Sequence, residues 1–526
     1  MFLSIKKFRP NGIPRRSEAP GGSGPGEKGI GEVKAPPSCF AQNKLGLLWA
    51  GVLEVGGVHL ALFLYTCGVA LPFPYQRGYG EGHMLLAAEA YQRGEGLYPT
   101  QRGAEMTRVT AYPPLFFVLN RWARRACPHP FLFGRLLSLL ATVGLGIGVF
   151  LLVRQMTASA VAALVAALAW FSLSYVQEWA PQMRVDLPAL FLAFWGIYGV
   201  LTQRRWALGA AALLFLLALY TKQTMIGGPI VAVTSLVARR KGREAWLLGV
   251  GVGAGSWILL LLLNALTHGG FYFNVVTCQP KQFEVPRLLQ ALHALLGQGD
   301  LFPVIGGLGL WGLLQLKHQH REWFAPFLAW LGVSGLNVLA CGKIGSDINY
   351  FLEISLVLVI LLGYAVSEAI KLAASLPSGR GIPASWATLV PVLLLIQGIG
   401  DLHPPDVPVQ TLLEAKRTVA EIIRRTPGAI LSEDVSLLLL HHRPVTYSGF
   451  ELANLAQRGI WDQSKILRDL RENRVSLVVA HPQTLAGLSD RRYTDEMLRL
   501  FRENYREAER IPPFVLLVPR QRKGAP

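Results

Sequence analysis

Charged side chains are scarce in this sequence, and their scarcity excludes an ordinary soluble protein. Of the 526 residues, 16% are charged and 52% are hydrophobic, and the mean hydropathy is +0.35. Soluble domains carry roughly a quarter charged residues. The hydrophobic residues also fall into separate blocks, each about long enough to cross a bilayer as a helix. The composition therefore predicts a protein that spans a membrane several times.

Cysteine is also rare, and its distribution excludes two further classes of protein. The five cysteines form no CxxC motif and pair with no histidine at metal-ligand spacing, so neither a disulfide framework nor a zinc site is predicted. A bridge among Cys127, Cys278 and Cys341, which the topology below places on one side, stays open. No cofactor is predicted; a divalent metal also stays open, although no cluster of ligands indicates one.

About eleven apolar blocks dominate the sequence. Their backbone must satisfy its hydrogen bonds within lipid, so each block is expected to be a helix. The first is too long for a cleavable signal segment and predicts an uncleaved anchor. The blocks cover residues 45–71, 131–153, 158–176, 185–202, 206–221, 223–238, 245–266, 301–316, 323–340, 350–370 and 383–400.

The basic residues predict the orientation of these helices. The net charge of +18 could indicate a nucleic-acid partner, but Lys and Arg lie in short junctions between apolar blocks, where membrane topology requires them. No nucleic acid is therefore expected. Every second junction is cationic, which predicts a multi-pass protein of the cell (inner) membrane with its N-terminus in the cytoplasm. The cationic junctions contain Arg154; Arg204 and Arg205; Arg239, Arg240, Lys241 and Arg243; Lys317 and Arg321; and Lys371 and Arg380.

Three regions follow from this reading. Residues 1–43 are rich in Gly, Pro and basic residues and predict a disordered basic cytoplasmic tail. Residues 44–401 form the transmembrane domain, in which the long first outer loop, 72–130, is expected to carry two helices lying at the membrane surface, Met84–Gln92 and 114–126. Residues 402–526 return to soluble composition and predict a small extracytoplasmic α/β domain.

Short strands and helices alternate in that last region. Helical periodicity covers Val409–Arg425, Gly449–Gln457 and Ser464–Glu472. Strands are predicted at Ala429–Ser432, Val475–Ala480 and Phe514–Val518. The predicted fold class is thus an α-helical polytopic membrane protein with a small C-terminal α/β domain.

Ionisable residues gather at the predicted outer ends of the spanning helices. Charged groups at membrane depth are costly and tend to mark functional cavities. The set consists of Glu81, Arg184, Asp186, Lys222, Lys343, Asp347 and Glu353, with Asn349 and Tyr350 nearby. The alternation of the helices could have scattered these groups over both sides, but it places all of them on one.

Each of these residues also has a purely structural interpretation. Glu81, between Gly80 and Gly82, is a candidate general base, but a carboxylate that caps the following helix would look the same. Lys222 is a candidate phosphate ligand, or a lysine that extends to the membrane interface. Arg184 and Asp186 are candidate ligands or a structural ion pair. The sequence leaves these alternatives open.

The order of these elements resembles the GT-C glycosyltransferases, and within them the bacterial protein- and lipid-mannosyltransferase type and its aminoarabinose-transferase relatives. The resemblance covers approximately residues 45–400. It rests on an acidic residue in the long outer loop, followed by motifs at later outer junctions. These are Tyr112-Pro113-Pro114-Leu115, Arg135, Arg184-Val185-Asp186, Thr221-Lys222-Gln223 and Gly345-Ser346-Asp347-Ile348-Asn349-Tyr350-Phe351-Leu352-Glu353.

The resemblance implies a membrane glycosyltransferase (hexosyltransferase type) that uses a polyprenyl-phosphate sugar donor on the outer side, with inversion at the anomeric carbon. Its partners would be this donor, membrane lipids, and a lipid, glycan or protein acceptor. Glu81 would be the counterpart of the catalytic carboxylate, although many members carry Asp or an Asp-Glu pair there. The substrate-binding set would be Lys222, Arg184, Asp186, Lys343, Asp347, Asn349 and Tyr350.

Two other functions compete with this one. A transporter or flippase of a lipid-linked glycan would explain the polar groups, but such proteins usually contain internal repeats with broken helices, and the sequence shows no such duplication. A non-catalytic scaffold that presents the C-terminal domain would have no need for acidic and basic groups on one side. The sugar, the acceptor and the oligomeric state are not encoded in any motif of the sequence.

Overall fold

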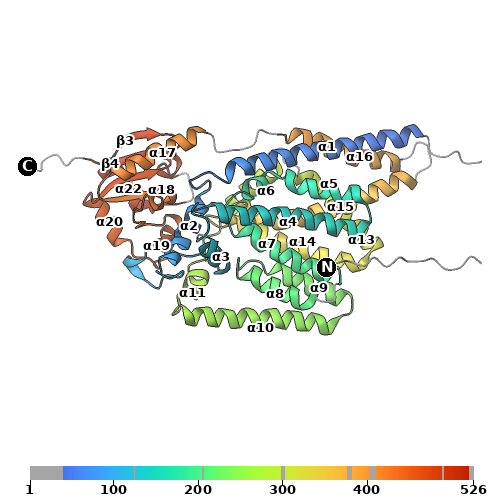
Figure 1. Cartoon of the computed structure of the whole chain (residues 1–526), viewed down its shortest axis with the longest axis horizontal. Helices are drawn as coiled ribbons and strands as arrows, with labels where there is room; N and C mark the ends of the chain where they lie inside the picture. The colour runs from blue at the N-terminus through green and yellow to red at the C-terminus, as the bar shows by residue number, and fades with distance from the viewer. Residues whose placement is uncertain are drawn as a thin grey trace, which may run out of the picture.

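A computed structural model describes residues 39–123, 125–203, 207–297, 302–375, 382–402, 410–487 and 491–520. Long helices run side by side along the longest axis of the molecule, and a compact domain built from the C-terminal residues caps one end of the bundle (Figure 1). Shorter helices from the outer loop lie between the bundle and this domain. Most of the predicted cytoplasmic tail, 1–43, lies outside the described residues.

All eleven apolar blocks form helices. Five helical segments are long and apolar enough to cross a membrane: Leu45–Ala70, Leu132–Thr157, Gly242–Leu266, Arg321–Gly342 and Ile348–Ser375. The other blocks form shorter helices, so the number of spans stays a prediction. The helices are α1 (Cys39–Ala70), α4 (Leu132–Thr157), α5 (Ala160–Ser172), α7 (Asp186–Leu201), α8 (Ala207–Leu219), α9 (Gly227–Ala238), α10 (Gly242–Leu266), α13 (Phe302–Gln319), α14 (Arg321–Val338), α15 (Phe351–Ser375) and α16 (Ile382–Gly400).

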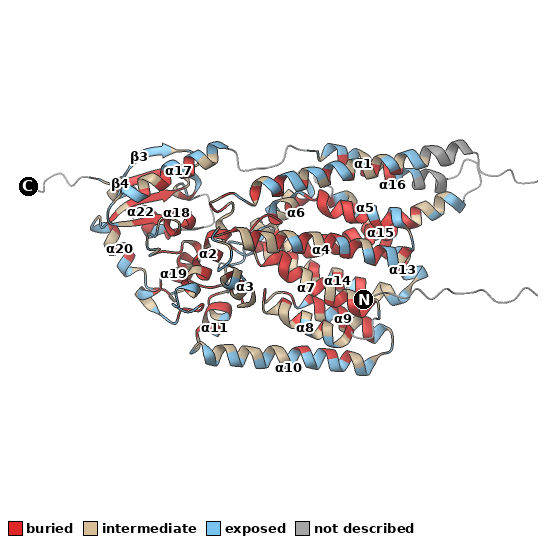
Figure 2. Cartoon of the chain, viewed as in Figure 1, coloured by how far each residue is buried: buried red, intermediate tan, exposed pale blue. Residues whose placement is uncertain are grey.

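Helix α15 is the centre of the bundle and α10 lies at its edge. The most apolar window of the segment that contains α15 is 89% buried, whereas that of α10 is only 11% buried. Figure 2 shows α10 as an outer helix with largely exposed and intermediate residues. Its exposed side chains include Trp246, Trp257 and Leu266. Such a surface suits contact with lipid, since lipid chains are as apolar as these side chains.

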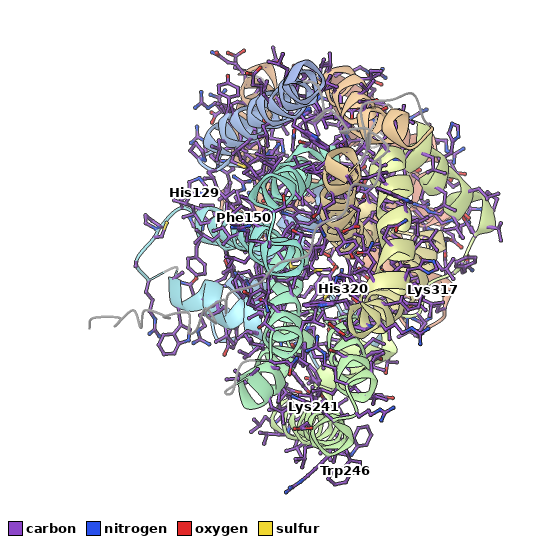
Figure 3. The ribbon with its side chains drawn as sticks, turned by 90° about the vertical axis from the view of Figure 1, so that its right-hand side faces the viewer. His129, Phe150, Lys241, Trp246, Lys317 and His320 are labelled. Carbon is purple, nitrogen blue, oxygen red and sulfur yellow. The ribbon has the colours of Figure 1, made fainter. Side chains whose placement is uncertain are left out.

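The cationic junctions lie at the end of the bundle away from the C-terminal domain. Arg154 closes α4, Arg239–Lys241 connect α9 to α10, and Lys317 lies in the last turn of α13. Figure 3 looks onto this end and labels Lys241, Lys317 and His320. Three other cations of the predicted pattern, Arg204, Arg205 and Arg380, lie outside the described residues. The charge asymmetry agrees with the predicted orientation, which stays a prediction.

The outer loop contains the two predicted helices, but neither simply lies on the membrane. Helix α2 (Tyr79–Gln92) begins five residues earlier than predicted and is buried around most of its circumference. It packs against α18 (Val435–Leu439) of the C-terminal domain and against α3 (Leu115–Ala123). The expectation that α2 lies on the lipid surface is therefore wrong, because protein covers it on both sides.

Several short elements complete the membrane half. The block predicted at 158–176 is interrupted at Leu173, which has an extended backbone and separates α5 from α6 (Ser174–Trp179). An amphipathic helix that the hydropathy blocks did not include, α12, precedes α13. The remaining elements here are η1 (Gly103–Glu105), α11 (Gly270–Tyr272), η2 (Phe273–Thr277), α12 (Val285–Gly297), η3 (Leu339–Gly342) and η4 (Ile348–Tyr350).

The C-terminal domain is a four-stranded sheet with helices packed around it. The strand order is β1-β2-β4-β3, with β1 parallel to β2 and the other pairs antiparallel. All three predicted strands are present, and β3 was missed. The elements are α17 (Gln410–Arg425), β1 (Ala429–Ser432), α18, α19 (Phe450–Gln457), α20 (Ser464–Arg471), β2 (Val475–Ala480), α21 (Pro482–Leu485), α22 (Asp495–Asn504), β3 (Tyr505–Ile511) and β4 (Phe514–Pro519).

Hydrogen bonds around a buried ion pair of this domain connect it to the outer loop. The Lys416 ammonium lies 2.6 Å from Asp434 and also donates to the Gln76 carbonyl at 2.7 Å. The Gln76 backbone N–H in turn donates to Ser436 at 3.1 Å. Separating the domain from the loop would break both hydrogen bonds of Gln76 and leave the buried Lys416 ammonium with one acceptor fewer. The domain is therefore held in a fixed place above the bundle.

Candidate active site

A cavity of about 190 Å³ lies where the bundle, the outer loop and the C-terminal domain meet. The outer loop contributes α2 and the segment around Tyr112. The bundle contributes the turns that connect its helices at this end, and the C-terminal domain closes the remaining side. The polar residues that line the cavity are Tyr79, His83, Thr110, Tyr112, Glu178, Trp179, Gln182, Arg184, Lys281, Asp347, Glu451 and Arg492.

Beside this cavity, the Asp186 carboxylate pairs with two cations. Its Oδ1 accepts hydrogen bonds from the Lys222 ammonium and from the Asn349 amide, each at 2.6 Å. Its Oδ2 accepts one from the Trp179 indole at 3.2 Å and lies 3.6 Å from Arg184 Nε. Four side chains from three junctions thus meet at one carboxylate, as expected if the outer junctions build a common site.

This cluster carries an excess of positive charge. Two cations, Arg184 and Lys222, share the single carboxylate of Asp186. Arg184 lines the cavity and is 14% exposed, whereas Lys222 is nearly buried and faces a narrow cleft with Asn349 and Tyr350. The Lys222 ammonium lies 5.1 Å from the centre of the Tyr350 ring. The arrangement can hold an anion at the membrane end of the cavity, where Arg184 reaches it directly.

Asp347 and Lys343 belong to the same turn but have different surroundings. Asp347 lines the cavity, and its Oδ1 accepts the backbone N–H of Ile348 at 2.8 Å, which holds the carboxylate in place. Lys343 is exposed and is not among the residues that line the cavity. The structure thus brings Asp347 together with Arg184, and it does not bring Lys343 to them.

Glu81 lies beneath the cavity floor rather than in it. Its carboxylate is 0% exposed and forms a two-pronged ion pair with the fully buried Arg135, at 2.8 and 2.9 Å. It also accepts the backbone N–H groups of Arg77 and Met183, at 2.7 and 2.6 Å. Burial alone would raise the pKa of Glu81, but the Arg135 guanidinium and these hydrogen bonds lower it below its ordinary value. In this structure Glu81 forms a structural ion pair with Arg135, which is neither of the two roles that the sequence suggested for it.

The glycine before Glu81 explains how Arg184 reaches the cavity. Gly80 lines the cavity, and a Cβ atom at this position would lie 1.3 Å from Arg184 Nη1. The guanidinium therefore occupies the space that any side chain at position 80 would fill. Position 80, and not position 81, faces the cavity. The Glu81 carboxylate, one residue later on α2, points away from the cavity and toward Arg135.

The sequence did not single out several residues of the cavity. His83, Lys281, Glu451 and Arg492 come from α2, from the segment before α12, and from the C-terminal domain. A signal existed for His83 alone, because residues four apart share one face of a helix. The Tyr79 and His83 rings are in tilted contact, with their centres 4.6 Å apart. The other three come from segments whose approach depends on the tertiary fold.

Protonation of the cavity histidine gives a testable pH dependence. Burial, with Arg492, Arg184 and Lys281 nearby, lowers the pKa of His83 from its ordinary 6.5 to about 3. Between these values the folded protein binds fewer protons than the unfolded chain, so stability falls as the pH falls through this window. We expect His83→Gln to flatten the decline by up to about 1.4 kcal/mol per pH unit.

Thermal unfolding in detergent between about pH 7 and about pH 5 measures this effect. The exposed His268 supplies the matched control, His268→Gln. A slope that His83→Gln leaves unchanged would show that other groups cause the decline.

Metal and disulfide chemistry find little support among the described residues. They contain no group of three or more His, Cys, Asp or Glu side chains that could hold a metal ion. Cys127, Cys278 and Cys341 are free thiols, so the bridge that the sequence left open does not form in this structure. Burial raises the pKa of Cys278 to about 12, which makes it a poor nucleophile.

Comparison with solved structures identifies the architecture. The aminoarabinose transferase ArnT from Cupriavidus metallidurans, bound to undecaprenyl phosphate, is 16% identical with a TM-score of 0.58, covering 89% of this chain and 98% of that one. Its apo structure is 15% identical with a TM-score of 0.57, covering 88% and 97%. The chain has the GT-C fold. No protein-family model and no curated sequence matches the chain.

A second GT-C protein agrees with this assignment. The apo oligosaccharyltransferase from Archaeoglobus fulgidus is 12% identical with a TM-score of 0.51, and the match covers 85% of this chain and 72% of that one. The resemblance read from the ordered motifs is therefore confirmed at the level of the fold. The match to ArnT also takes in most of the C-terminal region, which the sequence motifs did not cover.

Proposed function

We propose that this protein is a membrane glycosyltransferase that moves a sugar from a polyprenyl-phosphate donor to an acceptor hydroxyl on the extracytoplasmic side, with inversion. The observation that carries the proposal is the cavity at the end of a GT-C fold, where the cations around Asp186 meet the Asp347 carboxylate. A solved neighbour with the same fold, ArnT, holds undecaprenyl phosphate.

The cation cluster fits the departing phosphate. When the bond between the anomeric carbon and the phosphate oxygen breaks, the electron pair leaves with the polyprenyl phosphate. Arg184 and Lys222 can stabilise that charge, because they hold one positive charge in excess over Asp186. The Trp179 and Asn349 hydrogen bonds keep the Asp186 carboxylate, and with it both cations, in a fixed geometry. The phosphate is a stable anion, so its departure requires no general acid.

The nucleophile needs a group that accepts its proton. We assign this general base to Asp347, since its carboxylate lines the cavity and is held by the Ile348 N–H, whereas the Glu81 carboxylate is enclosed by four donors. The acceptor oxygen forms its bond to the anomeric carbon as the phosphate leaves from the opposite face, and Asp347 takes up the proton. A single displacement of this kind inverts the anomeric centre.

Protein reconstituted in lipid vesicles tests the function. Donors are polyprenyl-phosphate-linked sugars, and the measured product is free polyprenyl phosphate. Its release in the presence of an acceptor supports transfer. Movement of intact donor across the bilayer without release would instead identify a transporter and overturn the proposal. Addition of the donor to one side at a time tests the predicted orientation.

Lys222 supplies the prediction for donor binding. Lys222→Met removes an ammonium but leaves Asp186 with Arg184 and Asn349 as partners. Loss of a charge-assisted hydrogen bond costs about 1.5–3 kcal/mol, which is roughly a 10- to 100-fold change. We expect the KM for the donor to rise by this factor while the KM for the acceptor stays unchanged.

Initial rates at varied donor concentration measure the effect. Lys222→Arg should retain most of the donor affinity, and Lys371→Met at the opposite end of the bundle serves as the charge-matched control. An unchanged donor KM in Lys222→Met would leave Lys222 as an interfacial anchor only.

A further inference from the structure

The C-terminal domain forms one wall of the cavity, and its position there is tightly constrained. The backbone N–H of Phe450 donates to the Tyr79 hydroxyl at 2.8 Å. The preceding Gly449 has φ +58°, and a Cβ there would lie 2.2 Å from that hydroxyl. Only glycine lets the backbone approach the Tyr79 hydroxyl this closely. Glu451 and Arg492 are thereby fixed opposite α2.

Three polar atoms, two on this wall and one on α2 opposite it, lack a partner among the described residues, although each is buried. They are His83 Nε2, Glu451 Oε2 and Arg492 Nε, and all three residues line the cavity. The other ends of the two charged side chains are already fixed, Glu451 by Lys281 at 3.3 Å and Arg492 by Glu433 at 2.7 Å. Buried polar groups are rarely left unsatisfied, so these atoms point to a ligand that pairs with them.

The chemistry of the three atoms defines that ligand. Glu451 Oε2 can only accept a hydrogen bond, Arg492 Nε–H can only donate one, and the imidazole nitrogen of His83 can do either. A phosphate or carboxylate would face Glu451, and an ammonium would face Arg492. A hydroxyl both donates and accepts, so adjacent hydroxyls on one ring satisfy the whole set.

The charge of the cavity leads to the same class of ligand. Its lining contains three cations, Arg184, Lys281 and Arg492, and three carboxylates, Glu178, Asp347 and Glu451. The lining is therefore balanced in charge. Arg184 lies at its membrane end, beside the Lys222 ammonium and the Asp186 carboxylate. A charged lipid phosphate belongs at that membrane end. The wall formed by the C-terminal domain faces a neutral group.

We propose that His83, Glu451 and Arg492 form a subsite for the acceptor, and that the acceptor is a neutral, hydroxyl-rich sugar ring. The assignment to the acceptor rests on the proposed function, since the donor's phosphate is held at the membrane end and its sugar is attached to that phosphate. The C-terminal domain thus selects the acceptor, while the bundle binds the donor.

Saturation-transfer NMR on the full chain in nanodiscs tests the subsite without requiring turnover. The probes are neutral methyl glycosides of glucose, galactose, mannose and arabinose. Arg492→Lys keeps a cation for Glu433 but removes the Nε–H, and Glu451→Gln removes the acceptor charge. We expect each variant to weaken binding of the glycosides about tenfold or more. Arg499→Lys and Glu496→Gln on exposed positions of α22 should bind as the unmodified protein does.

Three outcomes would overturn the proposal. The first is glycoside binding that neither variant changes, in protein whose thermal unfolding is normal. The second is stronger binding of inorganic phosphate or glucosamine than of the neutral probes at the same wall. The third is displacement of the glycosides by a polyprenyl-phosphate-linked hexose, which would assign the subsite to the donor sugar. Absence of transfer with intact glycoside binding would count against the proposed function and leave the subsite standing.

Discussion

Asp347→Asn is expected to reduce transfer about 10²- to 10⁴-fold, the usual contribution of a positioned general base. The amide keeps the shape of the side chain, and its oxygen can still accept the Ile348 N–H, so the turn should stay folded. What is lost is the group that takes the acceptor's proton. The measurement is the release of polyprenyl phosphate under saturating donor, with thermal unfolding as the check on folding.

Two comparisons make this result specific. Glu496→Gln changes an exposed carboxylate of α22 and should leave the rate unchanged. Glu178→Gln changes another carboxylate of the cavity lining. If Glu178→Gln abolishes transfer and Asp347→Asn does not, the base is Glu178 and the assignment to Asp347 is wrong. A loss in Asp347→Asn confined to the KM for the donor would also contradict a role in proton transfer.

Glu81→Gln is expected to destabilise the protein by about 3–5 kcal/mol, because it leaves the buried Arg135 guanidinium without its counter-charge. Both side chains are 0% exposed, so water cannot replace the lost partner. The amide could accept from Arg135 with one atom only, and its NH₂ group would face the backbone N–H donors that the carboxylate now satisfies. Thermal unfolding in detergent, at a pH where the native carboxylate is ionised, measures the effect.

A double-mutant cycle with Arg135→Met separates this ion pair from other effects. The costs of Glu81→Gln and Arg135→Met should be strongly non-additive, since each removes the same interaction. Arg135→Met should lower the free energy of unfolding by more than the ion pair contributes. Arg135 also donates to four backbone carbonyls at the end of α1 and in the segment after it. A Glu81→Gln protein that unfolds normally and is inactive would return the general-base role to Glu81.

Much of the bundle was predictable because the period and length of an apolar block depend on local physics. All eleven blocks became helices, and strands such as Ala429–Ser432 and Val475–Ala480 were predicted at the bounds that the structure has. β3 was missed because its sequence, YREAERI, alternates poorly and five of its seven residues are exposed. Its pairing with β4 on the edge of the sheet, and not its own composition, makes it a strand.

The site was predictable in its location but not in the direction of each side chain. The junction motifs correctly brought Arg184, Asp186, Lys222 and Asn349 to one place. The catalytic role of Glu81 stays a prediction, but the direction of its side chain was not predictable, because α2 begins at Tyr79 and not near Met84. At about 100° per residue, Glu81 then lies on the side of the helix opposite Tyr79. The five residues before Met84 are thus helical, and this directs the Glu81 carboxylate away from the cavity.

The hydrogen bonds of Arg135 also have a consequence for how the chain is assembled in the membrane. Arg135 sits in the first turn of the second long helix, and every acceptor of its guanidinium belongs to the end of α1 or to the loop that follows. During synthesis that loop is made before Arg135, and in the predicted orientation it must cross the bilayer before the two can meet. Until then the guanidinium has no acceptor at membrane depth. In that orientation the loop must be exported before α4 can reach its final position. The Glu81–Arg135 ion pair beneath the cavity forms at the same point.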